Sequence, residues 1–209
     1  MCVNNIKKAL IVGAGEFTDR EINAHYDLVV AADAGLGQLL DNNVHPDVII
    51  GDFDSLGYVP DGTEVIVLPV EKDMTDLDAA IRLAWERGCR DLTVCGATGG
   101  NRIDHFLGNM QLGTEFSQLG AHVRMLAPDY SIYFLTDDSI VLHGRNGAVF
   151  SVLSQTTVSE GVSILGDAKY KICEENLGKK GTLSLSNEIC GNEIRISVKR
   201  GTLSVFLYE

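Results

Sequence analysis

The sequence lacks the features that would cross-link a fold through disulfides or zinc, or anchor it in a membrane. Its five cysteines are scattered and odd in number, with no CxxC pair, which argues against a disulfide framework or a zinc site and favours a reducing compartment. No apolar run approaches the length of a membrane span, and the run after Lys7 and Lys8 is too short for a signal peptide. Four prolines and an apolar fraction of 45% are typical of a globular protein. We therefore expect a soluble, cytoplasmic protein with no membrane partner.

Basic residues are also scarce: 17 Lys and Arg stand against 29 Asp and Glu, for a net charge of −12. Most of the excess lies in residues 1–128, which carry −10, whereas residues 129–209 carry −2. Nucleic-acid binding depends on cationic neutralisation of phosphates, so this balance predicts no nucleic-acid partner. For most of these acids the simplest interpretation is that they keep the protein soluble.

The first part of the chain alternates short apolar runs with helical patterns, which predicts βαβ units and a mainly parallel sheet. A helix is expected from Asp76 to Arg87, with Thr75 as its cap, Asp78 at capping-box spacing and Gly88 at its end. The expected strands are Ala9–Val12, Leu28–Ala31, Val48–Ile50, Val65–Leu68, Leu92–Cys95 and Val123–Leu126.

A second helix is predicted to begin near Ile103 and to continue past Phe116, with Phe106, Leu107 and Met110 facing inward. After about Pro128 the pattern changes to short β-branched runs, TLSLS among them, separated by Gly, Asn and Asp. Such runs are typical of antiparallel hairpins. The predicted fold is an N-terminal αβα domain with a mainly parallel sheet, residues 1–128, followed by a smaller all-β sandwich domain, residues 129–209.

Acidic patches follow three of the predicted strands, and strand ends of a parallel sheet gather at one edge, where ligands bind. In GDFDS, an extended backbone would turn Asp52 and Asp54 to the same side. Two carboxylates ~5 Å apart repel by roughly 3 kcal/mol at an effective dielectric near 20, and Asp76 would add to that cost. A bound Mg²⁺ removes it, so we expect Asp52, Asp54 and Asp76 to be metal ligands. The alternative is a turn in which Asp caps backbone amides.

The other two patches adjoin predicted helix starts. In EKDMTDLD, Asp73 and Asp76 also complement the helix dipole, and Lys72 either touches a phosphate or is solvated. GATGGNRIDH resembles an anion cradle: its glycines, Gly99 and Gly100 among them, let backbone amides approach a phosphate, and a helix follows. It lacks the GK[ST] ending of a Walker loop. The remaining candidates here are Arg102 as the cation for transferred charge, Asp104 as its partner or a metal ligand, and His105 and Asn109, which lie one turn apart and could share a ligand-facing side. The alternative for His105 is packing against the core.

An early glycine motif, GAGEFT, looks like the start of a dinucleotide-binding fingerprint, but Thr18 stands where the third glycine would be. We interpret it as a decoy, although a nicotinamide-dependent oxidoreductase remains a rival hypothesis. AADAG, a strand later, places Asp33 near a nucleotide or the metal cleft.

In order along the chain, AADAG, HPDVIIGDFDS, KDMTDLDAAI and GATGGNRIDHFLGN resemble the bacterial thiamine pyrophosphokinase family, and the late segments GDAKY and LSLSNE are similar to its ending. The resemblance implies transfer of pyrophosphate from ATP to thiamine with Mg²⁺, giving thiamine diphosphate and AMP. It also implies an α/β domain, a C-terminal β-sandwich for thiamine binding and dimerisation, and a homodimer with sites between subunits. A non-catalytic nucleotide or thiamine sensor is the alternative from another class.

The resemblance also implies roles for individual residues. Asp52, Asp54 and Asp76 would hold magnesium, and Asp54, Asp76 and Arg102 would be the catalytic set. The ATP and reaction cleft would be lined by Asp33, Lys72, Asp73, Thr75, Gly99, Gly100, Arg102, Asp104, His105 and Asn109. Ser186 and Asn187 would hydrogen-bond the aminopyrimidine of thiamine, and Tyr170 would stack on its cationic ring.

Overall fold

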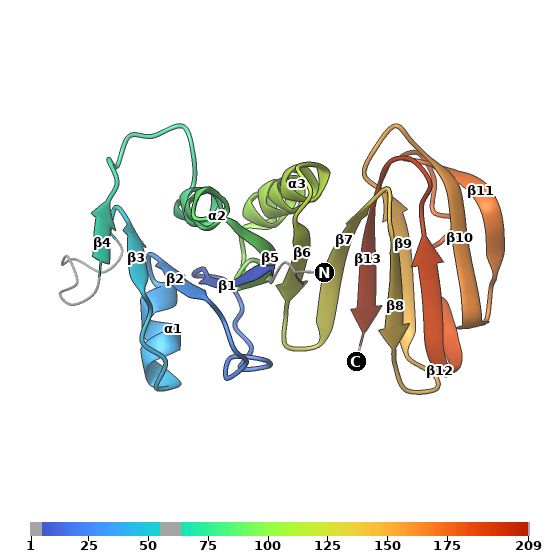
Figure 1. Cartoon of the computed structure of the whole chain (residues 1–209), viewed down its shortest axis with the longest axis horizontal. Coiled ribbons are helices and arrows are strands. Elements are labelled where there is room, and N and C mark those ends of the chain that lie inside the picture. Colours follow the sequence, from blue (N-terminus) through green and yellow to red (C-terminus); the bar gives the residue numbers. More distant parts are fainter. Residues whose placement is uncertain (1–5, 55–63, 209) are drawn as a thin grey trace, which may run out of the picture. The chain divides into compact units, whose positions relative to one another are not determined.

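The computed structural model describes residues 6–54 and 64–208, and its elements fall into two compact units (Figure 1). The first comprises residues 1–112 with 125–128, and the second comprises residues 113–124 with 129–209. Ser55 of the GDFDS motif lies outside the described residues. No helix in the described ranges is long and apolar enough to cross a membrane.

The first unit contains a parallel sheet in the strand order β4-β3-β2-β1-β5, as predicted from the βαβ pattern. Val12 at the end of β1 pairs with Ala31 of β2 and Cys95 of β5, so these strands end together at one edge. Each predicted strand is present; the bounds are β1 Lys7–Val12, β2 Leu28–Ala32, β3 Val48–Gly51, β4 Glu64–Val67, β5 Cys89–Cys95 and β6 His122–Leu126.

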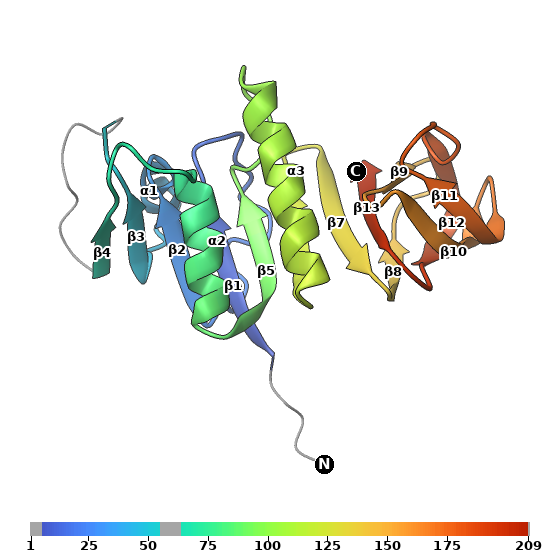
Figure 2. The same ribbon diagram turned by 90° about the horizontal axis from the view of Figure 1, so that it is seen from above.

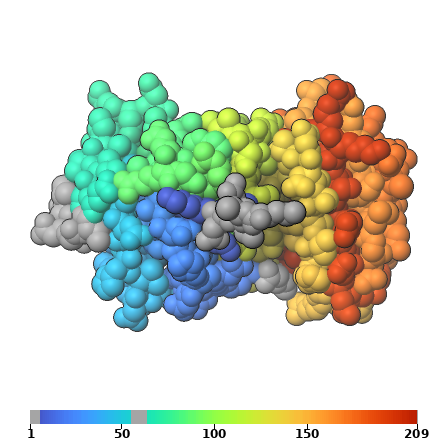
Figure 3. Space-filling view, viewed as in Figure 1, coloured from blue at the N-terminus to red at the C-terminus, as the bar shows by residue number. Residues whose placement is uncertain are grey.

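Helices α1 (Gly35–Asp41) and α2 (Asp76–Glu86) lie on opposite faces of this sheet (Figure 1). Seen from above, α2 runs along the strands (Figure 2). The predicted cap of α2 is confirmed, because Thr75 Oγ1 accepts the backbone N–H of Asp78 at 3.2 Å. The apolar stripe of α2 is buried at Leu77, Ala80, Ile81 and Ala84. Figure 3 shows one face of the molecule, with the residues of the first unit in blue to green.

Helix α3 spans Ile103–Gln118, close to its predicted bounds. Met110 is buried and Phe106 half-buried, but Leu107 is 56% exposed, so its predicted inward orientation is wrong. Residues four apart share a helix face. Leu107 therefore lies beside Ile103, which is 73% exposed, and not on the face of Phe106 and Met110.

The second unit is built from antiparallel strands around one apolar core that includes Phe150, Ile164, Ile189 and Val205. β13 pairs with β7 and β9, and β12 pairs with β8, β9 and β10; β11 pairs with β10. The bounds are β7 Tyr130–Thr136, β8 Ser139–His143, β9 Val149–Ser154, β10 Val158–Ala168, β11 Ile172–Gly178, β12 Asn187–Ser197 and β13 Thr202–Tyr208.

The segment TLSLS, residues 182–186, is a turn and not the predicted strand. Its alternation is apolar–polar, but Leu183 is 78% exposed and Leu185 is 39% exposed, so the apolar positions have no core to enter. Instead Leu185 N–H donates to Thr182 O at 3.1 Å, and Ser184 O accepts Val152 N–H at 2.9 Å. Strands β10 and β11 are additional to the predicted runs.

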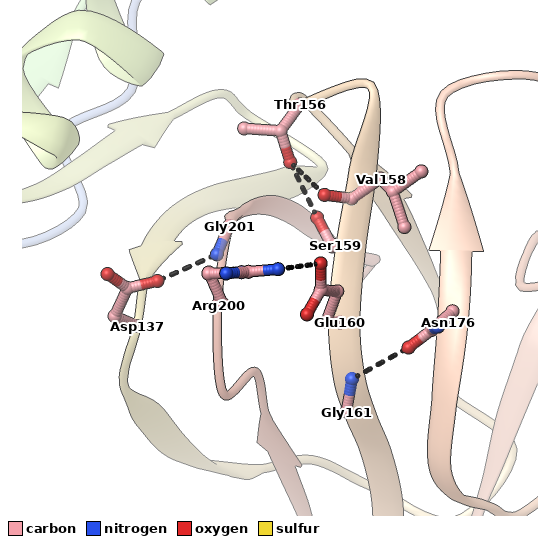
Figure 4. A network of polar contacts seen from close by, with 9 residues as sticks. All are labelled: Asp137, Thr156, Val158, Ser159, Glu160, Gly161, Asn176, Arg200 and Gly201. Atoms are coloured by element: carbon pink, nitrogen blue, oxygen red, sulfur yellow. Dashed lines mark hydrogen bonds and ion pairs between the residues drawn. The ribbon is translucent and has the colours of Figure 1, made fainter.

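A polar network joins the turns at one end of the second unit (Figure 4). At its centre Ser159 is fully buried, and its Oγ lies 3.0 Å from Thr156 Oγ1 and 3.1 Å from Thr202 O. Buried hydroxyls are costly unless hydrogen-bonded, so these contacts hold the turns in one arrangement. Further links are Gly201 N–H to Asp137 Oδ1, the Arg200–Glu160 ion pair and Gly161 N–H to Asn176 Oδ1.

The loops that follow β1 and β5 are hydrogen-bonded to one another. Gly13 N–H donates to Cys95 O at 2.9 Å, and Gly15 N–H donates to Gly96 O at 2.8 Å. Gly96 has a φ of 67°, and a Cβ built there would lie 2.7 Å from the Gly13 carbonyl carbon. Only glycine combines this left-handed backbone with so close an approach.

We predict that Gly96→Ala destabilises the protein by several kcal/mol more than Gly88→Ala. Both glycines have left-handed backbones, a conformation that costs an alanine roughly 1–2 kcal/mol of stability. Gly88 (φ 87°), however, has no atom within 4 Å of a built Cβ, so its substitution adds no steric clash. Urea unfolding of the two variants measures the difference. Equal losses of unfolding free energy in the two variants would show that the close contact between the loops does not contribute to stability.

Candidate active site

A pocket of about 320 Å³ lies within the first unit, where the carboxyl ends of β1, β2 and β5 meet the amino-terminal ends of α2 and α3. This is the edge at which ligands bind open α/β sheets. Eight of the predicted site residues line it: Asp33, Thr75, Asp76, Gly99, Gly100, Arg102, His105 and Asn109. Residues from three separate sequence motifs therefore share one pocket.

The decoy motif GAGEFT also belongs to this pocket, because Gly13, Ala14 and Gly15 form part of its wall. As a dinucleotide fingerprint the motif is incomplete, and its role in the pocket was not predicted from the sequence. The available signal was its position directly after a strand, at the same edge as the acidic motifs. Thr98, whose hydroxyl is buried, is a second lining residue that the sequence analysis did not identify.

Asp33 follows β2 in a left-handed conformation, with a φ of 48°. Its backbone N–H donates to Ile50 O at 2.9 Å, and a Cβ built on Gly51 would lie 3.2 Å from Asp33 Cα. Non-glycine residues rarely adopt this conformation, which clusters at functional sites. The neighbouring strand end therefore holds Asp33 in place at the pocket wall.

Asp52, Lys72 and Asp76 form a compact charge cluster next to the pocket. Lys72 Nζ lies 2.5 Å from Asp52 Oδ2 and 3.1 Å from Asp76 Oδ1. The three side chains are only 11%, 13% and 22% exposed for Asp52, Lys72 and Asp76. Two acids from different motifs are thus brought together as predicted, and Lys72 is a partly buried ion-pair partner of both, not a solvated surface lysine.

The cluster shifts the acidities of its members. The hydrogen bond from Lys72 holds the pKa of Asp52 below its usual value. Burial raises the pKa of Asp76 despite the nearby ammonium, and the charges of Asp52 and Asp33 raise it further. For Lys72, burial lowers the pKa, but the hydrogen bonds and the negative charges of Asp52 and Asp76 together raise it above its usual value.

The predicted extended geometry of GDFDS is wrong, because β3 ends at Gly51 and Phe53 has a φ of 57°. The chain turns there: Asp54 N–H donates back to Asp52 Oδ1 at 3.3 Å, and the Asp54 side chain is exposed. Among the described residues, no group of three or more His, Cys, Asp or Glu side chains is arranged to hold a metal. Metal coordination by Asp52, Asp54 and Asp76 stays a prediction.

The carboxylates of Asp52 and Asp76 nevertheless fit a divalent cation in their chemistry. Both present oxygen atoms to a single cationic atom, Lys72 Nζ, and Mg²⁺ takes oxygen ligands of this kind. Asp33, at the pocket wall, adds its negative charge to the environment of Asp76.

Arg102 and Asp104 form an ion pair at the start of α3. Arg102 Nη2 lies 2.7 Å from Asp104 Oδ2, and Nε lies 2.9 Å from Oδ1, a two-point contact. The hydrogen bond from Arg102 lowers the pKa of Asp104 to about 2. Both side chains are more than 60% exposed, so the guanidinium stands on the pocket rim with its orientation set by Asp104.

The remaining predicted residues of this unit differ in their placement. Asn109 is buried, and its Nδ2 donates to Ala97 O at 2.7 Å, which fastens α3 to the glycine loop. His105 lines the pocket from the same helix. Asp73 is exposed and does not line the pocket.

Tyr170, Ser186 and Asn187 lie in the second unit, where the side chain of Asn187 is hydrogen-bonded to the backbone of Tyr170. Its Oδ1 accepts Tyr170 N–H at 3.0 Å, and its Nδ2 donates to Tyr170 O at 2.7 Å. Asn187 is buried, whereas the Tyr170 side chain is 63% exposed. Ser186, with a φ of 56°, is anchored by its backbone N–H on Ser151 Oγ. The asparagine thus positions the tyrosine backbone and leaves the ring accessible.

Comparison with known proteins gives consistent matches. The family model for the thiamin pyrophosphokinase catalytic domain matches residues 20–125. Thiamine pyrophosphokinase of Bacillus subtilis (strain 168) is 29% identical over 205 residues, covering 94% of this chain and 92% of the relative.

Solved structures agree with the sequence matches. The crystal structure of thiamine pyrophosphokinase from Bacillus subtilis superposes with a TM-score of 0.84 and 25% identity, covering 97% of this chain and 99% of that one. A thiamin pyrophosphokinase family protein from Enterococcus faecalis gives 0.81 and 26%, with coverages of 97% and 99%. The family model covers half of the chain, including the acidic motifs and the glycine loop around the pocket, and the chain therefore belongs to the thiamin pyrophosphokinase family.

Proposed function

We propose that this protein is a thiamine pyrophosphokinase, which transfers pyrophosphate from ATP to thiamine and releases thiamine diphosphate and AMP. One observation carries the proposal: in a member of this family, the pocket brings together two glycine loops, the start of a helix and Asp76. Asp52 and Lys72 lie beside Asp76 in the charge cluster next to the pocket. Backbone amides and helix starts suit phosphate groups. The clustered carboxylates suit a divalent ion that accompanies a polyphosphate.

In this proposal the ATP phosphates lie along the glycine loop that contains Gly99 and Gly100. Both glycines have left-handed φ values, 71° and 73°, which lets backbone groups approach a ligand closely. Arg102 on the rim neutralises phosphate charge, with Asp104 fixing the direction of its guanidinium. Thr75 caps α2 beside the same space.

Mg²⁺ is the proposed cofactor, held by Asp52, Asp54 and Asp76. When bound, it would neutralise phosphate charge and orient the polyphosphate. Asp52 and Asp76 are supported as ligands by their convergence on one cationic atom. Asp54 extends from the same turn as Asp52, and its exposed side chain is the third proposed ligand.

The proposed reaction is a direct in-line displacement. The hydroxyl oxygen of thiamine bonds to the β-phosphorus of ATP, the bond from that phosphorus to the bridging oxygen breaks, and AMP leaves with this oxygen. The hydroxyl proton passes to a carboxylate, for which Asp54 and Asp76 are the candidates. Such transfers depend mainly on positioning and charge neutralisation, which the pocket residues supply.

For thiamine, we propose that Tyr170 stacks on the cationic ring and Ser186 hydrogen-bonds the aminopyrimidine, while Asn187, whose buried amide is bonded to the Tyr170 backbone, positions the tyrosine. The support is the exposed Tyr170 ring on a backbone held by Asn187. A flat cation gains both stacking and cation–π attraction on such a ring.

The proposal extends to organisation. Residues 1–128 would form the αβα catalytic domain, and residues 129–209 a β-sandwich that binds thiamine and forms a homodimer with sites between subunits. The αβα domain is supported by the parallel sheet with α1 and α2 on its opposite faces. The β-sandwich is supported by strands β7 through β13, whose pairings with one another are antiparallel. We place the enzyme in the cytoplasm, on the grounds of its five scattered cysteines, which include no CxxC pair.

The direct test is incubation of the protein with ATP, thiamine and Mg²⁺, with chromatography of the products. We expect AMP and thiamine diphosphate in equal amounts, and neither product after chelation of divalent ions. Binding of both ligands without AMP would instead identify a non-catalytic sensor. Production of ADP would contradict the proposed site of attack.

Asp54→Asn and Asp76→Asn are each expected to lower kcat by roughly 100-fold or more, because each removes a negative charge from the proposed metal site. Thermal unfolding should show the fold intact. Asp41→Asn, an exposed acid at the end of α1 and outside the pocket, is the matched control and should leave kcat unchanged. If Asp76→Asn lost activity only through a collapsed unfolding temperature, its role would be structural.

Tyr170→Ala is expected to raise KM for thiamine by roughly 2- to 30-fold, the range of a cation–π contact, with KM for ATP unchanged. Tyr170→Phe keeps the aromatic face and should stay close to the parent in steady-state kinetics. An equal rise in both Michaelis constants would exclude a stacking role.

A further inference from the structure

Lys72 occupies an unusual position for a lysine. Its side chain is 13% exposed, whereas lysines are rarely buried unless paired. It is paired twice: the same nitrogen contacts Asp52 at 2.5 Å and Asp76 at 3.1 Å. One ammonium group therefore serves two carboxylates that come from different strand ends.

The cluster depends on this ammonium for its charge balance. Asp52 and Asp76 are largely buried, and Asp33 adds a third negative charge near Asp76. Like charges at this range repel strongly where water is scarce. Removing one member of a buried ion pair leaves an uncompensated charge, so without Lys72 the two carboxylates would move apart or take up another cation.

The position of the ammonium is also the position that a divalent cation would need. A divalent cation held by Asp52 and Asp76 would lie beside the oxygens that face Lys72 Nζ, and the ammonium and the divalent ion would repel one another at that distance. A flexible four-carbon stem lets the lysine head leave the carboxylates without unfolding the loop that carries it.

We infer that Lys72 is a built-in counter-cation, which holds Asp52 and Asp76 together in the metal-free protein and competes with the divalent ion for their oxygens. On metal entry Lys72 moves to the polyphosphate that accompanies the ion, where its charge is again compensated. This inference rests on the proposed function, because that function supplies the metal and the polyphosphate.

The test measures Mn²⁺ binding in the absence of ATP and thiamine, by electron paramagnetic resonance of the free ion. Lys72→Met removes the charge and keeps the length of the side chain. We expect this variant to bind Mn²⁺ roughly tenfold more tightly than the parent, since the competing charge is gone. Its unfolding temperature should be lower without metal and should rise more steeply as Mn²⁺ is added.

Lys199→Met is the matched control, because Lys199 forms an exposed ion pair with Glu174 at 2.7 Å outside the pocket. It should leave Mn²⁺ affinity unchanged. Equal or weaker Mn²⁺ binding by Lys72→Met would overturn the inference and make Lys72 a fixed structural partner.

A second measurement uses the parent protein and so stands even if Lys72→Met does not fold. Reductive methylation of Lys72, followed by peptide mass spectrometry, should be slow without metal and faster with saturating Mn²⁺, while Lys199 is labelled equally in both. Unchanged labelling of Lys72 would contradict the inference. Neither readout needs turnover, so absence of AMP in the activity assay would count against the proposed function alone.

Discussion

The charge balance at the edge of the parallel sheet is the constraint on which the site depends. Strands that run in the same direction end together, so acids that follow separate strands are brought close whether or not their charges are compensated. Here Asp52 and Asp76 meet within 3.1 Å of one ammonium nitrogen. A cation stabilises such a cluster, because repulsion between largely buried carboxylates is only weakly screened by water. A site of this kind is prepared for a cationic ligand.

Strained backbone conformations occur at two proposed site residues and at Phe53, next to a third. Asp33, Phe53 and Ser186 have φ values of 48°, 57° and 56°, a conformation that costs a non-glycine residue free energy. Phe53 is 3% exposed, and its burial offsets part of that cost while the turn holds Asp52 toward Lys72. The glycine loop meets the same demand by a different route, since Gly96 adopts a left-handed backbone without a side chain to accommodate.

The second unit uses hydrogen bonds of a side-chain amide to present an exposed ring. Asn187 is buried and gives its oxygen and its nitrogen to the backbone of residue 170. A buried amide needs such partners, so the contacts stabilise the turn as well as placing the tyrosine. The asparagine is therefore a positioning residue in the structure, and the ring is the surface available for a ligand.

The strands and helices of the first unit follow from local pattern, because short continuous apolar runs such as Ala9–Val12 are typical of the strands of a parallel sheet buried on both faces, and Thr75 caps α2 within its own turn. The gathering of Asp33, Asp76 and Arg102 at one pocket was predictable from the pattern as well, because strands that run in the same direction put the motifs that follow them at one edge. Features that depend on contacts across the fold were not predictable.

The rotation of Leu107 out of the core and the exposed turn at TLSLS required knowledge of which neighbours are present. A local pattern gives the period of an element but not the surface that covers it. The pocket role of Gly13 to Gly15 arises from hydrogen bonds to a loop more than 80 residues away in the chain. The position of Lys72 between two acids is likewise tertiary, since its sequence neighbourhood is equally compatible with a solvated lysine. The sequence by itself determined which chemistry gathers at the sheet edge, and only the tertiary structure decided which charges are paired there, because pairing depends on distances of a few ångströms between residues far apart in the chain.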